Sequence, residues 1–248
     1  MTDAWTGEAR ALLDRAVERH GGRAAWESLR TLPLTLRSLS GLVPWVKGLG
    51  RTFPQPGRAD VFPHEARAVF HDYPAAGQRG VFNAGAVEIV DAGGAVVVSD
   101  PAPRASFRGL RKWRRWSPAD ALYFFGYAVT HYHGLPFTLA DGRPLRLVRV
   151  RCEGRPVTGV EVELPASLHT HCRRQTFYFD EDGLLRRHDY RADIVGWMAV
   201  GAHLWRDFVD GAGIPFARER HVVLRLGRTT TPLVALRAEL DLHPFGSD

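Results

Sequence analysis

The sequence predicts a mainly β protein (α+β) in which one strongly curved antiparallel sheet of about eleven strands wraps around a central helix. Three observations support this fold. The 248 residues, 45% of them hydrophobic, suffice for one sizeable core. The 25 glycines and 16 prolines are scattered along the chain, which indicates many short elements joined by tight turns. Strand-like alternation is interrupted once in mid-chain, by an apolar helical segment.

The chain is expected to begin with two helices. Residues 7–20 place four apolar side chains on one helical face and end at His20, before a pair of glycines that is typical of a helix C-cap. A second short helix is predicted over residues 23–29, with Trp26 facing inward. From Thr31 onward apolar and polar residues alternate, so the first strand follows directly.

Strands then follow at close spacing after an irregular stretch at 41–57, which is rich in Gly and Pro and is expected to form a crossing or an edge ribbon. Short Pro, Ala-Gly and Gly-Gly turns between the strands are typical of an antiparallel meander. The strands predicted in this half are 58–62, 66–71, 80–83, 87–91 and 95–99.

The central helix has a clear start. Ser117 is a good N-cap and Pro118 suits the first helical position. The apolar run 121–129 continues to about residue 134 and is apolar almost all round. Such a helix must be buried, so we expect it to lie in the concavity of the sheet.

The remaining chain returns to strand patterns, without internal repeats or linker-like tracts. We therefore expect a single domain over residues 1–248. The strands predicted in this half are 145–152, 158–164, 169–179, 184–194, 202–208, 217–226 and 234–242.

The opening helix, Gly21-Gly22, helix and strand resemble the start of proteins of the LolA superfamily, as residues 16–26 leading through Leu29 to Leu32 show. This resemblance implies an open half-barrel of about eleven antiparallel strands, closed by helices, that holds an acyl chain in an apolar concavity. Residues 123–127 and 175–187 are similar to uncharacterised bacterial proteins of about 250 residues.

The N-terminus has no signal-peptide pattern and no segment reaches the length of a membrane span, so we expect a cytoplasmic protein. A periplasmic role in lipoprotein transport is therefore not expected. The implied function is binding of a hydrophobic or amphipathic small molecule in the concavity, with no cofactor required.

The hairpin around Asp182-Gly183 carries the polar residues that suit chemistry. Strand parity places odd residues before the turn and even residues after it on one face. The predicted catalytic residues on this face are His169, His171, His188 and Tyr190. Imidazoles titrate near neutrality and a phenol can donate to an oxyanion, so the alternative function is an enzyme of cyclase, isomerase or hydrolase type. These histidines are otherwise ordinary partly buried residues bonded to the backbone.

The same histidines suggest a second chemistry. His169 and His171 on one strand face, with His188 or His203 as a third ligand, would form an open three-histidine metal site. The His-x-His pattern is weak, so whether a metal ion binds is left open.

A stripe of side chains at helical spacing, Tyr123, Tyr127 and His131, is expected to line the cavity or to form core with polar tips at its rim. The predicted ligand contacts are Trp116, Tyr123, Tyr127, His131, Gln175, Phe177 and His203.

Other functions are disfavoured because the chain lacks a phosphate-binding loop, a dinucleotide-binding glycine motif and a nucleophile elbow. Cys152 and Cys172 alternate with arginines, which would favour a lowered pKa, but neither lies in a nucleophile motif.

The formal charge of +6 comes from 33 Lys and Arg against 27 acids. Most cations are expected to face solvent. The basic and aromatic run 104–116 is expected to be a solvated connection, a lid over the cavity or a peripheral membrane contact. Nucleic acid is not an expected partner, because no nucleic-acid-binding fold accompanies the run.

Overall fold

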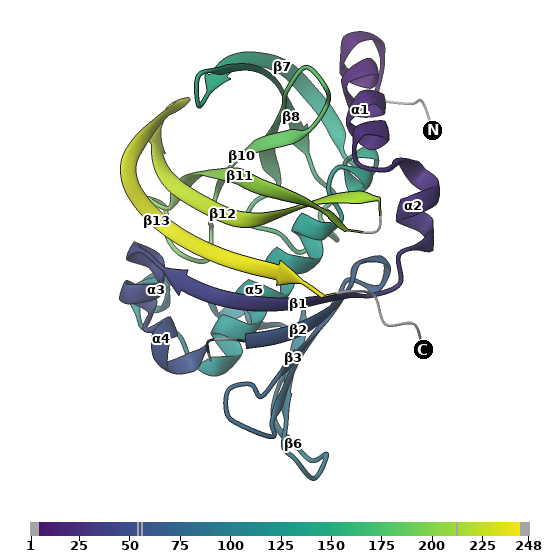
Figure 1. Ribbon diagram of the computed structural model, residues 1–248. Coiled ribbons are helices and arrows are strands. Elements are labelled where there is room, and N and C mark those ends of the chain that lie inside the picture. Colours follow the sequence, from purple (N-terminus) through teal and green to yellow (C-terminus); the bar gives the residue numbers. More distant parts are fainter. Residues whose placement is uncertain (1–4, 54, 56, 212, 244–248) are drawn as a thin grey trace.

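A single antiparallel sheet organises the protein in the computed structural model (Figure 1), which describes residues 5–53, 55, 57–211 and 213–243. Across these residues the sheet has thirteen strands in the order β6-β5-β4-β3-β2-β1-β13-β12-β11-β10-β9-β8-β7. The strands are β1 (Leu32–Ser40), β2 (Gly57–Phe62), β3 (Arg67–His71), β4 (Arg79–Asn83), β5 (Ala86–Val90), β6 (Val96–Asp100), β7 (Arg143–Cys152), β8 (Arg155–Glu163), β9 (Arg174–Phe179), β10 (Leu185–Arg191), β11 (Val200–Gly211), β12 (Ile214–Leu226) and β13 (Thr229–Leu242).

The chain enters the sheet at its middle. It runs from β1 out to the edge strand β6, crosses to the opposite edge at β7, and returns strand by strand to β13, which pairs with β1. The crossing segment contains the central helix, α5 (Pro118–His133). The other helices are α1 (Gly7–Arg19), α2 (Gly22–Ser28), α3 (Leu42–Lys47) and α4 (Leu49–Thr52), and the 3-10 turns are η1 (Pro63–Glu65), η2 (Pro103–Ser106), η3 (Gly109–Trp113) and η4 (Phe137–Asp141).

The predicted curved sheet around a central helix is confirmed, with corrections. Thirteen strands replace about eleven, and two short helices, α3 and α4, lie within the stretch expected as a crossing or edge ribbon. The strand predicted over 169–179 begins only at Arg174. Before it, the carbonyls of Thr170 and His171 accept hydrogen bonds from Arg104 at 2.7 and 3.2 Å, so this backbone is held by a side chain instead of a neighbouring strand.

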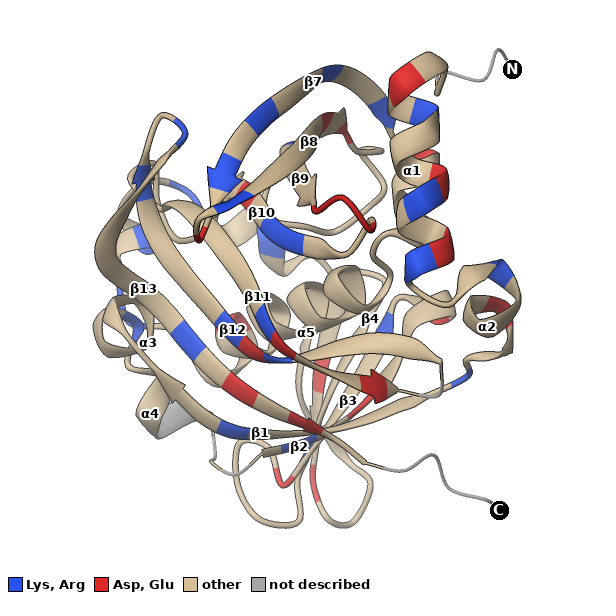
Figure 2. Cartoon of the chain, turned by 45° about the horizontal axis from the view of Figure 1, so that its top comes forward, with Lys and Arg blue, Asp and Glu red and all other residues tan. Residues whose placement is uncertain are grey.

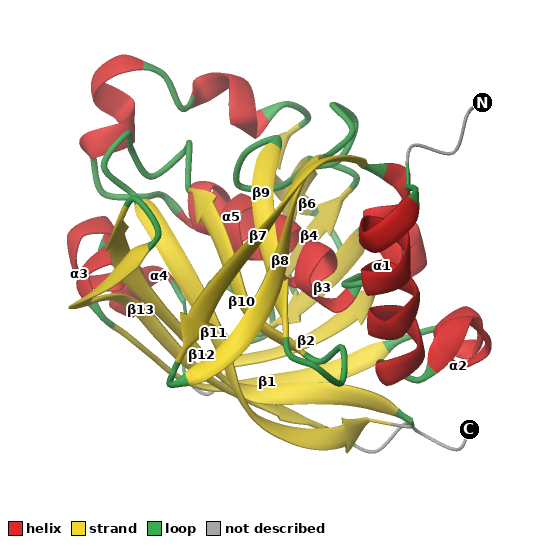
Figure 3. Cartoon of the chain, turned by 90° about the horizontal axis from the view of Figure 1, so that it is seen from above, coloured by secondary structure: helices red, strands yellow, loops and turns green. Residues whose placement is uncertain are grey.

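Helix α5 begins at a capping box. The Asp120 amide donates to Ser117 Oγ at 3.2 Å, and the Ser117 amide donates to the Asp120 carboxylate at 3.0 Å. Pro118 occupies the first helical position, as predicted. Eleven of the sixteen residues of α5 are buried, so water touches little of this helix. Figure 3 shows α5 within the curve of the sheet, with α1 and α2 at one end and α3 and α4 at the other.

Both halves of the sheet pack against α5. On the β2–β5 side, the rings of Phe53 and Phe125 lie 4.3 Å apart, and Gly126 lies against Phe82 of β4. On the β9–β12 side, the ring of Tyr132 lies 4.7 Å from that of His203. The helix therefore joins two meanders that are far apart in the strand order.

Charged residues of both signs are interspersed over the outer surface (Figure 2). Arg143 and Arg146 on β7 pair with Glu163 and Glu161 on β8, and Arg149 pairs with Glu8 on α1. These are exposed pairs, each worth little in stability. They support the interpretation of the +6 charge as an ordinary solvated surface.

Close packing at Gly126 gives a test of this arrangement. A Cβ atom there would lie 2.3 Å from Cβ and Cγ of Phe82, whereas a Cβ atom at Gly50 in α4 meets nothing within 4 Å. Both glycines are helical, so alanine improves helix propensity at each. We expect Gly126→Ala to lower the free energy of unfolding by about 1–3 kcal/mol through overpacking. The matched Gly50→Ala variant should lose nothing in urea unfolding, and equal effects of the two changes would contradict this packing.

Candidate functional site

An apolar concavity opens between α5 and the sheet. It measures about 1060 Å³, counted to include the space open to solvent. Its walls are aliphatic and aromatic side chains from β1–β3, α5, β12 and β13, with Val43 of α3 and the loop around Val195 at its margin. Five lining residues have polar side chains: Tyr132, His133, Tyr190, His203 and Arg220. An apolar chamber with a few polar groups is typical of a small-molecule site.

Two of the predicted site residues, Tyr190 and His203, are among the residues lining this concavity. The others are packed between α5 and the neighbouring strands and loops, outside the lining. Of the two alternatives for Tyr123, Tyr127 and His131, lining of the cavity or core with polar tips at its rim, the packing favours the second. The residues that lie outside the lining are Trp116, Tyr123, Tyr127, His131, His169, His171, Gln175, Phe177 and His188.

His171 lies at the centre of a buried hydrogen-bond network. Its Nδ1 pairs with the Tyr127 hydroxyl at 2.9 Å, and its Nε2 pairs with the Tyr132 hydroxyl. Tyr132 also donates to the Tyr190 hydroxyl at 3.2 Å, and the Tyr190 ring stacks on His171 with centroids 3.9 Å apart. Both ring nitrogens of His171 are thus occupied, which leaves neither for a substrate.

The predicted common face of the hairpin is confirmed for four residues. His188 on β10 lies opposite Phe177 on β9 and opposite His203 on β11, and the same register aligns Gln175 with Tyr190. His188 Nε2 pairs with Gln175 Oε1, and the Gln175 amide donates to Thr170 Oγ1 at 2.8 Å. This amide ties the loop before β9 to the hairpin.

His169 is not part of that face. Its Nδ1 pairs with the Tyr123 hydroxyl at 3.0 Å, and Arg104 donates to the same hydroxyl at 3.3 Å. Arg104 thus points inward from the basic run 104–116. Trp116 is buried as well, and none of the described lining residues comes from this run. The run therefore covers one end of α5 and does not form a lid over the concavity.

Burial keeps the inner histidines neutral. Desolvation lowers the pKa of His131 to about 4 and that of His133, which also faces Arg220, to about 3. The pKa values of His171, His188 and His203 are also well below the usual range, for the same reason. The acid–base hypothesis requires histidines that titrate near neutrality. Burial in this environment instead lowers their pKa values below that range.

The metal hypothesis finds no support in the arrangement. Across the part of the chain that the structure describes, no group of three His, Cys, Asp or Glu side chains is placed to hold a metal ion. His169 and His171 bind different tyrosines and do not form the predicted chelating pair.

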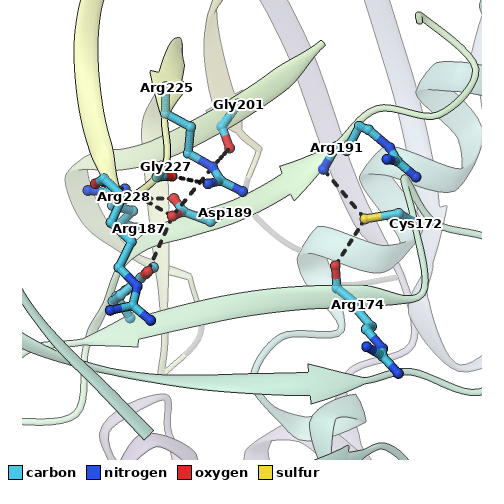
Figure 4. A network of polar contacts seen from close by, with 10 residues as sticks. Cys172, Arg174, Arg187, Asp189, Arg191, Gly201, Arg225, Gly227 and Arg228 are labelled. Carbon is cyan, nitrogen blue, oxygen red and sulfur yellow. Dashed lines mark hydrogen bonds and ion pairs between the residues drawn. The ribbon is translucent and has the colours of Figure 1, made fainter. Parts of the chain in front are cut away.

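The cysteines are buried and unreactive in character. Cys172 donates to the Arg174 carbonyl at 3.1 Å and accepts from the Arg191 amide at 3.5 Å (Figure 4). Burial raises the pKa of both Cys172 and Cys152, which agrees with the absence of a nucleophile motif around them.

An exposed apolar rim adjoins the concavity at Val43 and Ala199, two lining residues whose chain neighbours Leu42 and Met198 belong to the rim. Its members come from α3, η3 and the loop before β11: Leu42, Trp45, Leu110, Trp113, Trp197 and Met198. Trp45 is 77% exposed and Trp197 71%. Lys47 donates to the Lys112 carbonyl, which joins α3 to η3, and a Cβ atom at Gly196 would lie 3.6 Å from the Trp113 ring. Among the described helices, none is long and apolar enough to span a membrane.

Three polar residues of the lining were missed in the sequence: Tyr132, His133 and Arg220. Tyr132 joins His171 to Tyr190, and Arg220 packs its guanidinium on the ring of Trp205 at 3.6 Å. Arg220 alternates with Phe216 and Val222, so it lies on the inner face of β12. This alternation is the sequence signal that would have identified Arg220 as a buried residue.

The lowered pKa values of the buried histidines predict that the stability of the fold decreases strongly in acid. Six buried imidazoles have lowered folded-state pKa values: His20, His131, His133, His171, His188 and His203. The unfolded chain takes up protons near pH 6.5, but the folded chain does so only at lower pH. Stability is therefore complete above pH 6.5 and falls below it, by up to about 1.4 kcal/mol per pH unit for each imidazole.

Urea midpoints measured between pH 8 and 5 check this, and His131→Phe should flatten the decline. A midpoint unchanged over that range would contradict neutral buried histidines.

Comparison with known proteins supports the fold. No protein-family model and no curated protein matches the chain. Among solved structures, a LolA superfamily protein from Nitrosomonas europaea superposes with a TM-score of 0.52 over 96% of this chain and 92% of that chain, at 10% identity. A DUF1329 family protein from Desulfovibrio piger gives a TM-score of 0.46 over 96% and 92% of the two chains, at 13% identity. The first likeness confirms the predicted resemblance at the level of fold: this chain has the LolA-like half-barrel.

Proposed function

We propose that the protein binds a hydrophobic or amphipathic small molecule in the concavity between α5 and the sheet. The observation that carries this proposal is the lining itself, which is apolar except for a few polar side chains. The likeness to a LolA superfamily protein, at a TM-score of 0.52, agrees with a half-barrel that encloses an apolar space.

The physical basis is the hydrophobic effect. Removing apolar surface from water contributes about 25 cal/mol per Å², so a chain that fills the concavity gains most of its affinity from burial. Polar groups then select orientation, because an unsatisfied buried donor costs free energy. Tyr190 and His203 are the predicted residues placed to do this.

Blocking the concavity tests the proposal. Ala199 lines the concavity and is partly exposed, so Ala199→Phe should fill the space without disturbing the core. We expect about a ten-fold loss of affinity for the fluorescent probe N-phenyl-1-naphthylamine, because the larger ring occupies volume the probe needs. Ala24→Phe, at an exposed position in α2, is the matched control and should bind normally. Equal affinity of both variants, or no binding by the unaltered protein, would contradict the proposal.

We also propose that the ligand is exchanged at an anionic lipid surface. The apolar rim presents three exposed tryptophans, and the run beside it carries exposed Arg108, Arg114 and Arg115, none of which has an acidic partner within the described chain. Tryptophans next to cations suit the membrane interface. The cytoplasmic location of the protein stays a prediction.

Vesicle binding tests this surface. The protein should sediment with phosphatidylglycerol vesicles more than with phosphatidylcholine vesicles, and Trp113→Ala combined with Trp197→Ala should reduce the bound fraction several-fold. Val97→Ala, at an exposed apolar position on the far edge strand β6, should leave it unchanged. Binding that ignores lipid charge and the two tryptophans would refute a docking role for the rim.

A further inference from the structure

Arg220 is buried without a counter-ion. Only 4% of this residue is exposed, and its Nε and Nη1 atoms have no hydrogen-bond partner among the residues that the structure describes. The guanidinium lies on the Trp205 ring at 3.6 Å and 5.7 Å from the Phe216 ring. Aromatic stacking does not replace the lost hydration of a buried charge, which in proteins is normally balanced by a partner.

Two other inward arginines show that this chain otherwise satisfies its buried cations. Arg187 binds Asp189 through two hydrogen bonds of 2.6 and 2.9 Å (Figure 4). Arg104 donates to two carbonyls and to the Tyr123 hydroxyl. Arg220 differs, because no carboxylate in the described chain lies within ion-pair distance of it. Burial lowers its pKa to about 9, as expected for a cation that lacks an anion.

Other buried polar atoms near Arg220 also have no hydrogen-bond partner in the described structure. His203 has both ring nitrogens unpartnered, and Trp205 Nε1 is a buried donor with no partner in the described structure. His133 bonds the Val129 carbonyl through Nδ1 at 2.7 Å and leaves Nε2 unpartnered. Arg220, His133 and His203 all line the same concavity. One part of an apolar chamber therefore gathers unpartnered polar atoms around a fixed positive charge.

We infer that the concavity takes an amphipathic anion, whose carboxylate or phosphate oxygens pair with Arg220 while its apolar chain lies along the aliphatic lining. This inference rests on the proposed function and specifies its ligand class. A planar guanidinium can bind either oxyanion through two parallel hydrogen bonds. The pair would be formed in an apolar setting, where a charge-assisted hydrogen bond is strong.

Ligands of equal chain length separate the contribution of the head group to affinity from that of the apolar chain. Dodecanoate, dodecyl phosphate and dodecanol are titrated against the full chain at pH 7.5, by displacement of N-phenyl-1-naphthylamine. We expect at least one of the two anions to bind about ten-fold tighter than dodecanol or better. Comparing dodecanoate with dodecyl phosphate identifies the preferred oxyanion.

Variants of Arg220 test whether this residue causes the preference for the anionic ligand. Arg220→Met keeps the length and removes the charge, so the preference for the anion should disappear while dodecanol affinity is retained or improved. Arg220→Lys should keep part of the preference. Arg206→Met is the matched control on the neighbouring strand β11, where Arg206 binds Glu153 and His221, and it should keep the full preference.

The three-ligand comparison distinguishes failure of this inference from failure of the proposed function. If the unaltered protein binds all three ligands equally well, this inference is overturned while the proposed function stands. If it binds none of them, both fail. An anion preference that survives in Arg220→Met would also overturn the role of Arg220, and the three-ligand comparison on the unaltered protein needs no variant to fold.

Discussion

The burial of α5 is the constraint on which the rest of the structure depends. A helix that is apolar on nearly all sides cannot be covered by one flat sheet, because a sheet contacts only one side of it. The chain meets this requirement by running from one sheet edge to the other through α5, so that β2–β5 and β9–β12 pack on different sides of the helix. Curvature of the sheet follows from this packing, and the concavity is the space that the helix leaves unfilled.

The sequence allowed most of this architecture to be predicted because its signals are local. The cap at Ser117-Pro118, the paired glycines after His20 and the alternation along each strand all act within a few residues. The late start of β9 and the helices α3 and α4 depend on distant partners. Arg104, for example, lies 66 residues from Thr170, whose carbonyl it holds.

The candidate site was less predictable, for a related reason. Strand parity correctly placed Gln175, Phe177, His188 and Tyr190 on one face of the sheet. Parity does not predict whether that face packs against a helix or lines a cavity. Most of that face meets α5, so its histidine, His188, bonds Gln175 and stays neutral. The polar end of the concavity depends on Arg220 of β12, which is separated from the hairpin by the whole of β11, and a single arginine among 33 Lys and Arg attracts no notice in a sequence.

The proposed ligand site joins the polar end at Arg220 to the apolar lining. A crystal structure of the protein with bound dodecanoate tests this site most directly. We expect electron density for the chain between α5 and the inner faces of β12 and β13, with a carboxylate oxygen within hydrogen-bonding distance of the Arg220 guanidinium. Density for the chain on the outer face of the sheet, or a carboxylate turned toward solvent with Arg220 still unpaired, would contradict it.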